Sequence, residues 1–176
     1  MFAATAATIV SGAIAERCQF LAYFAYSITL TGVVYPPVCH WAWAEGGWLA
    51  RSGYYRDYAG SGVVHLLGAT CALIGCYFIG PRSGRFVEKK DPVGMPGHSV
   101  PLAGLGGFIL MFGFLAFNGG SQARITGKGD GEVVALSIVN TILGASAGGL
   151  TVLFSNKFLL GQSWSFLMCL NGALTG

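Results

Sequence analysis

The sequence predicts an all-α, polytopic membrane protein, and three observations lead to that fold class. Hydrophobic residues make up 53% of the 176 residues, and the mean hydropathy is +0.61. Charged residues make up only 10%, against about 25% in soluble domains. The apolar residues fall in long uncharged runs, and such runs cross a bilayer as helices. We therefore expect a single transmembrane domain over residues 1–176.

The first two apolar segments cover residues 1–15 and 18–39, with a Glu-Arg pair between them that marks a membrane edge. The first is uncharged but short for a span, and it lacks the basic n-region of a signal peptide. The second ends near Pro36 and Pro37, where we expect the helix to break. The Trp- and Tyr-rich connection that follows is typical of the aromatic belt at a membrane interface.

The third predicted span, 57–80, begins with Asp57. After that aspartate it contains no other charged residue and a single histidine, His65. An ionisable group inside a span is by default a functional hypothesis. On an α-helix, His65 would lie roughly 12 Å along the axis from Asp57 and about 80° around it. Two plainer interpretations stay open: His65 as a hydrogen-bonding partner of a neighbouring helix, and Asp57 as an N-cap alone.

The remaining predicted spans are 99–123, 133–156 and 158–176. The loops after the odd-numbered spans hold six Lys and Arg residues, and the opposite loops hold four. This bias places the odd-numbered loops in the cytoplasm. Four of the six lie in one loop: Arg82, Arg85, Lys89 and Lys90. The many glycines inside apolar runs are expected to let helix backbones approach closely.

This topology puts several cation-attracting groups at the external end of the bundle. Aromatic faces attract small cations, and a serine hydroxyl accepts a hydrogen bond from a donor such as ammonium. Phe117 and Ser121 share one helix face. An apolar path beyond would favour a neutral amine, with a titratable imidazole to handle the proton. Phe117 as plain packing and Trp43 as a belt residue remain alternatives.

Other kinds of function find little support in the sequence. The basic residues are scattered between spans and form no patch for nucleic acid. The five cysteines lie in or at the ends of apolar runs without paired metal-ligand spacing, so we interpret them as small packing residues. We expect no metal and no cofactor. His40 and His98 lie at span ends, where solvated or capping roles are favoured.

Four ordered runs closely resemble signature segments of the ammonium transporter family, Amt/Mep/Rh, on its Amt side. They are SGAIAER (11–17), HWAWAEGGWL (40–49), DYAGSGVVH (57–65) and FNGGS (117–121). The resemblance implies a transporter, not an enzyme, with eleven spans, a homotrimeric assembly in the plasma membrane and one pore in each subunit. This chain resembles the middle of such a protein, from the third span to the eighth, about six of the eleven spans.

The resemblance also implies a role for each candidate site residue. Trp43 and Ser121 resemble the cation–π and hydroxyl partners of external ammonium, and Phe2 and Phe117 the stacked gate below. Asp57 resembles the acidic residue that supports the site, and His65 the first histidine of the twin-histidine pore. Ammonium would be deprotonated and passed as ammonia, with proton transfer along the histidines.

Two departures and three rival functions accompany this resemblance. The second pore histidine is absent from these residues. The loop from Trp43 to Asp57 is slightly longer than in bacterial members of the family, so the nearby Trp41 and Trp48 compete with Trp43 for its assignment. The rivals are an ammonium sensor, a Rh-like channel for neutral gas, and a non-conducting truncated subunit. The cation-site residues argue against the gas channel, because a neutral substrate needs no cation–π partner.

Overall fold

The computed structural model describes residues 1–86 and 94–176, in which helices are joined by loops and no strand is found. The chain divides into two compact units, Met1–Met95 and Pro96–Gly176. The first unit holds α1 (Phe2–Ile14), α2 (Phe20–Thr29), η1 (Leu30–Val34), α3 (Tyr35–Trp43), α4 (Trp48–Arg51), η2 (Ser61–Leu66) and α5 (Leu67–Ile79). The second holds α6 (Val100–Gly120), α7 (Asp130–Phe154), η3 (Ser155–Leu159) and α8 (Phe166–Thr175). The all-helical fold class predicted from the sequence is confirmed.

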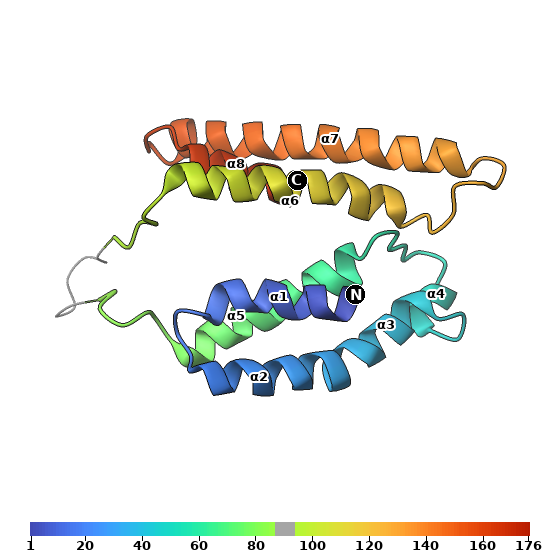
Figure 1. Ribbon diagram of the computed structural model, residues 1–176, viewed down its shortest axis with the longest axis horizontal. Helices are drawn as coiled ribbons and strands as arrows, with labels where there is room; N and C mark the ends of the chain where they lie inside the picture. The colour runs from blue at the N-terminus through green and yellow to red at the C-terminus, as the bar shows by residue number, and fades with distance from the viewer. Residues whose placement is uncertain (87–93) are drawn as a thin grey trace. The chain divides into compact units, whose positions relative to one another are not determined.

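The expected helix break at Pro36 and Pro37 does not occur, because α2, η1 and α3 follow one another as a single bent rod (Figure 1). A proline within a helix removes one amide donor, and its ring clashes with the carbonyl four residues earlier. The five residues of η1 form a π-helical turn just before these prolines. The wider π-helical turn relieves this conflict, and the helix continues to Trp43.

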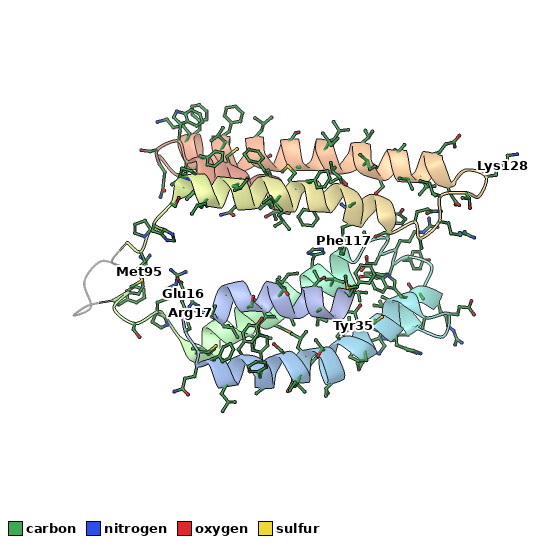
Figure 2. All side chains as sticks on the ribbon, in the orientation of Figure 1. Glu16, Arg17, Tyr35, Met95, Phe117 and Lys128 are labelled. Carbon is green, nitrogen blue, oxygen red and sulfur yellow. The ribbon has the colours of Figure 1, made fainter. Side chains whose placement is uncertain are left out.

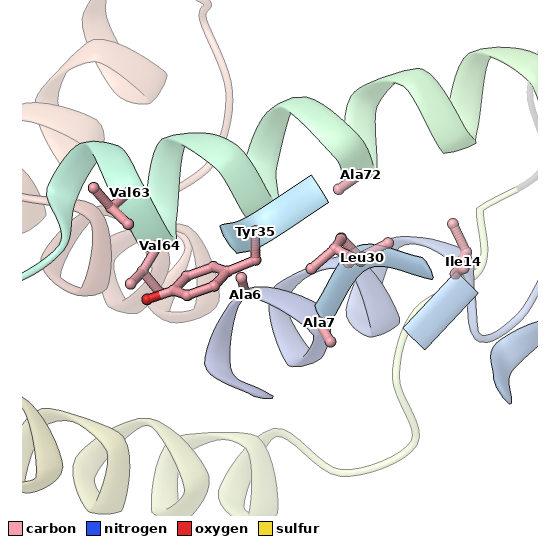
Figure 3. Close-up of a cluster of buried hydrophobic side chains, with 9 residues drawn as sticks. Ala6, Ala7, Ile14, Leu30, Tyr35, Val63, Val64 and Ala72 are labelled. Carbon is pink, nitrogen blue, oxygen red and sulfur yellow. The ribbon is translucent and has the colours of Figure 1, made fainter. Parts of the chain in front are cut away.

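The core of the first unit is built mainly from small and β-branched side chains, with one leucine and one tyrosine (Figure 3). Its buried members are Ala6, Ala7, Val10, Ile14, Leu30, Tyr35, Val63, Val64 and Ala72. Helices α1 and α5 approach closely, since a Cβ atom added to Gly68 would lie 3.0 Å from the carbonyl oxygen of Ala6. Tyr26 ties α2 to α1 by donating from its hydroxyl to the Ala7 carbonyl at 3.2 Å. Small residues thus serve the packing role expected of them.

The loops after α1 and α5 meet at the same end of the first unit. The Nε atom of Arg82 lies 2.6 Å from a carboxylate oxygen of Glu16, which with Arg17 follows the last turn of α1 (Figure 2). Both loops were predicted to lie on one side of the membrane, and this ion pair agrees with that. Lys89 and Lys90, which contribute to the predicted charge bias, lie outside the described residues.

The second unit packs α6, α7 and α8 side by side (Figure 1). Here the predicted boundary between spans 133–156 and 158–176 is wrong, because the helix of α7 and η3 runs to Leu159 and α8 begins only at Phe166. Ser165 fixes that later start, since its hydroxyl accepts from the Met168 amide at 3.3 Å. Lys157 lies within the helix and places its ammonium 5.7 Å from the ring centroid of Trp164.

Three helices in the described residues are long and apolar enough to cross a membrane: Ser61–Ile79, Val100–Gly120 and Asp130–Leu159. Two shorter apolar helices cover Phe2–Ile14 and Phe166–Thr175. Large apolar side chains are exposed along these helices, among them Leu73 and Phe78 on α5, Phe108 and Phe112 on α6, and Leu136 and Leu143 on α7. Such surfaces suit contact with lipid or with further helices rather than with water.

Candidate functional site

Asp57 forms the cap of the helix that carries His65. One carboxylate oxygen accepts from the Gly60 amide at 2.6 Å, and the other accepts from the amides of Gly62 and Val63 at 2.9 and 2.8 Å. Gly60 has a left-handed φ of 97°, which glycine adopts without a steric penalty, and this turn brings Asp57 over the helix start. The carboxylate thereby satisfies free amides at the positive end of the helix. Its hydrogen-bonding capacity is directed at the backbone.

Tyr55 and Gly62 complete the surroundings of this carboxylate, and neither was singled out from the sequence. The Tyr55 hydroxyl donates to Asp57 Oδ2 at 3.4 Å. Burial raises the pKa of Tyr55 and the Asp57 carboxylate raises it further, so the phenol stays a donor at neutral pH. A Cβ atom added to Gly62 would collide with the Tyr55 hydroxyl. The D-x-x-G-x-G spacing from 57 to 62 was the available signal for this compact cap.

Trp43 ends α3 and joins Asp57 to Phe2. Its indole Nε1–H donates to the main-chain carbonyl of Asp57 at 2.8 Å. Its ring contacts that of Phe2, with centroids 5.4 Å apart and planes at 61°. Trp41 and Trp48 pair with each other instead, at a centroid distance of 6.1 Å. Trp43 is thus in contact with Phe2, while Trp41 and Trp48 are in contact with each other.

His65 lies much nearer the helix start than the sequence predicted. The helix begins at Ser61, not at Asp57, so the estimate of roughly 12 Å along a continuous α-helix does not apply. The first six residues form the π-helical turn η2, in which the amides of Val64 and His65 both donate to the Gly60 carbonyl at 2.9 Å. π-Helical turns occur frequently at functional sites. The His65 side chain is half-buried.

Phe117 and Ser121 lie at the C-terminal end of α6, in the second unit. Ser121 Oγ donates to the Phe117 carbonyl at 2.7 Å, so its lone pairs remain available to accept a hydrogen bond. The neighbouring side chains Asn118 and Gln122 bond to α7: Asn118 Nδ2 donates to Thr141 Oγ1 at 2.9 Å and Gln122 Nε2 to Asp130 Oδ1 at 2.8 Å. Neither of these two hydrogen bonds was predicted from the sequence.

The described residues contain no cluster of His, Cys, Asp and Glu side chains that could hold a metal ion. All five cysteines are free, and the thiol of Cys76 donates to the carbonyl of Ala13 at 3.6 Å. His40 and His98 are exposed. Within the first unit, the structure therefore brings Phe2, Trp43 and Asp57 together at the start of the His65 helix.

An all-helical chain with several bilayer-length apolar helices and polar groups held at helix ends belongs to the class of multi-pass integral membrane proteins. More particularly, the chain belongs to the Ammonium Transporter Family, whose model matches residues 1–176. The family recognised from the four sequence runs is thereby confirmed.

Known relatives agree with this assignment. A Caenorhabditis elegans relative is 47% identical over 185 residues, with 100% of this chain and 34% of its own length covered. Ammonium transporter 1 member 3 of Oryza sativa subsp. japonica is 44% identical, with 99% of this chain and 38% of its own length covered. The crystal structure of Saccharomyces cerevisiae Mep2 matches with a TM-score of 0.82 and 32% identity, covering 98% of this chain and 36% of that one. The chain thus spans little more than a third of the length of these proteins.

Proposed function

We propose that the full-length protein carrying this segment transports ammonium across the plasma membrane. Family membership supports this proposal, as do the ammonium-transporter names of the plant relatives. The observation that carries it is the arrangement around Asp57. The Trp43 indole and the Phe2 ring lie together, and the same aspartate caps the helix that bears His65. Groups suited to attract a cation are thereby linked to a group suited to handle a proton.

In the proposed mechanism, recognition of the cation comes first. The family resemblance assigns Trp43 a cation–π interaction with ammonium, and it assigns Ser121 the role of accepting one of the ammonium N–H groups. Asp57 supports the site without contacting the cation, since its carboxylate already accepts hydrogen bonds from three backbone amides. An aromatic site and a neutral acceptor favour a small cation that carries its own hydrogen-bond donors over a bare metal cation of similar size.

Deprotonation follows at the aromatic gate, a role that the family resemblance assigns to Phe2 and to Phe117. Moving an intact ion into an apolar path costs several kcal/mol or more, whereas ammonia enters as a neutral molecule. Ammonium gives ammonia and one proton, and we assign the role of proton acceptor to the His65 imidazole, which lies on the membrane-spanning helix Ser61–Ile79. Transfer of both species gives net ammonium uptake. The family resemblance implies a second pore histidine as the partner of His65 in the relay, and a homotrimer is the proposed assembly.

Selectivity in the full-length protein tests this function. Ammonium uptake is measured in cells without their own ammonium transporters, with potassium as competitor. Ser121→Ala removes one hydrogen bond to a charged partner, worth about 1.5–3 kcal/mol, and should lower ammonium-over-potassium selection about tenfold or more.

Ser146→Ala is the matched control, because the Ser146 hydroxyl makes the same kind of local bond, to the Ile142 carbonyl at 2.8 Å on α7. It should leave selection unchanged. Equal selection in both variants would remove Ser121 from the recognition of the cation. An intact protein that takes up no ammonium would instead favour a sensor or a non-conducting subunit.

A further inference from the structure

Two side-chain hydrogen bonds tie the end of α6 to α7 on both sides of Ser121. Asn118 donates to Thr141, and one turn later Gln122 donates to Asp130, at 2.9 and 2.8 Å. Asn118 lies in the last turn of α6, which ends at Gly120, and Gln122 lies in the turn that follows. Phe117 and Ser121 directly precede these two residues in the chain. The two ties therefore fix the rotation of the turn that presents Phe117 and Ser121.

Asp130 is a rigid anchor for Gln122. Its side chain is buried, with 6% of the residue exposed, and it stands at the first residue of α7, where a negative charge is favourable. Its second carboxylate oxygen accepts from the Gly127 amide at 2.8 Å, and its own amide donates to the Gly127 carbonyl at 3.2 Å. Since the acceptor is charged and already oriented, the bond from Gln122 is among the stronger kinds.

The end of α6 needs such an anchor, because its local structure is weak. Gly119 and Gly120 precede Ser121, and glycine lowers the intrinsic stability of a helix by up to about 1 kcal/mol for each residue. Ala123 follows with a left-handed φ of 58°, a conformation that costs an alanine about 1–2 kcal/mol. Gly119 does allow close contact with α7, as an added Cβ would lie 3.2 Å from Ile138. The end of α6 is thus held against α7 by Gly119 and by the side chains of Asn118 and Gln122.

We propose that Gln122, through Asp130, is a positioning residue that keeps the Ser121 hydroxyl oriented as an acceptor for ammonium. The proposal rests on the proposed function. While the last turn of α6 is intact, Ser121 gives its own proton to the Phe117 carbonyl and offers only lone pairs to a cation. If the turn unwinds, the hydroxyl loses both its fixed position and the acceptor that orients its proton, so its lone pairs are no longer directed at one place. Gln122 therefore sets the affinity for the cation without touching it.

The test measures the KM and the maximal rate of ammonium uptake, with the amount of protein at the cell surface, for variants of the full-length protein. Gln122→Glu keeps the size of the side chain but sets a carboxylate against Asp130. It should raise KM about tenfold with the maximal rate per surface molecule within about twofold. Gln122→Ala removes the bond without repulsion and should raise KM about threefold to fivefold. Gln162→Glu, at an exposed glutamine of the same unit, should change neither value.

A polarity swap sharpens this test. When Gln122→Glu is combined with Asp130→Asn, the new amide at position 130 can donate to the new carboxylate at position 122, while its oxygen still accepts from the Gly127 amide. The KM of this double variant should return to within about threefold of the wild-type value.

An unchanged KM in both single variants would overturn the proposal. So would a fall in maximal rate and surface protein at constant KM, since that pattern marks a structural role alone. If the wild-type protein shows no uptake, the proposed function fails as well; uptake with an unaltered KM in the variants refutes the positioning role and leaves the function standing.

Discussion

Replacing Asp57 by alanine should destabilise the start of the His65 helix more than an ordinary lost cap. Asp57→Ala leaves three partly buried amides without an acceptor, those of Gly60, Gly62 and Val63. A single N-cap bond is worth about 1 kcal/mol, and hydrogen bonds to a charged group about 1.5–3 kcal/mol each. Because water replaces part of the lost bonding at this membrane edge, we expect a net cost of about 3–5 kcal/mol.

Two further substitutions separate charge from geometry at this position. Asp57→Asn retains one oxygen, so it should keep part of the capping and lose about half as much stability as the alanine variant. Asp57→Glu retains the charge on a longer side chain and should keep some folding or activity. The control is Glu45→Ala, which removes an exposed carboxylate from the loop before Asp57.

The assay is the thermal unfolding midpoint of the purified full-length protein in detergent, together with ammonium uptake by the same variants. The expected order of stability is wild type, then asparagine or glutamate, then alanine. The Glu45 control should match the wild type. A fully active Asp57→Ala protein with a wild-type unfolding midpoint would show that the cap is dispensable, and the reasoning from its hydrogen bonds would be refuted.

Two other predictions concern the same helix. His65→Ala should greatly reduce or alter the ammonium-driven transport current without preventing assembly, because it removes the titratable group near the helix start; the exposed His40→Ala is its control, and an undiminished current would remove His65 from the mechanism. Gly62→Ala should cost about 1–3 kcal/mol of stability, because the new methyl group would collide with Tyr55. Gly32→Ala, where an added Cβ meets no atom within 4 Å, should be neutral or stabilising, and equal unfolding midpoints for the two variants would contradict the crowding at Gly62.

Hydropathy predicted the all-helical fold class, since an uncharged run of bilayer length has few alternatives to a helix. Their ends were harder to predict. Pro36 and Pro37 signalled a stop by their chemistry, yet the π-helical turn before them accommodates both. Lys157 suggested a loop, but it lies inside the helix and reaches Trp164. In both cases the chemistry of a single residue predicted the end of a helix, but a neighbouring π-helical turn or aromatic contact allowed the helix to continue.

The candidate site shows a similar division. Asp57 was open to interpretation as an N-cap, because an acidic residue before an apolar run commonly satisfies free amides. Its bond from Trp43 was not predictable, since it joins residues 14 apart through a main-chain carbonyl. The same holds for Gln122, whose role depends on the fold of the loop from Gly127 to Asp130. Sequence patterns identify chemical groups, whereas their orientation depends on contacts formed only in the folded chain.

The two hydrogen-bonding ends of Asp57 have a mechanical consequence. Its main-chain carbonyl accepts a hydrogen bond from the Trp43 indole, and its carboxylate accepts hydrogen bonds from the first turn of the His65 helix. Asp57 therefore bridges the aromatic ring and the start of that helix. A displacement of the indole therefore pulls on the peptide of Asp57 and, through one side chain of fixed length, on the amides of Gly62 and Val63. The indole and the turn that bears His65 are therefore joined through the two ends of one residue.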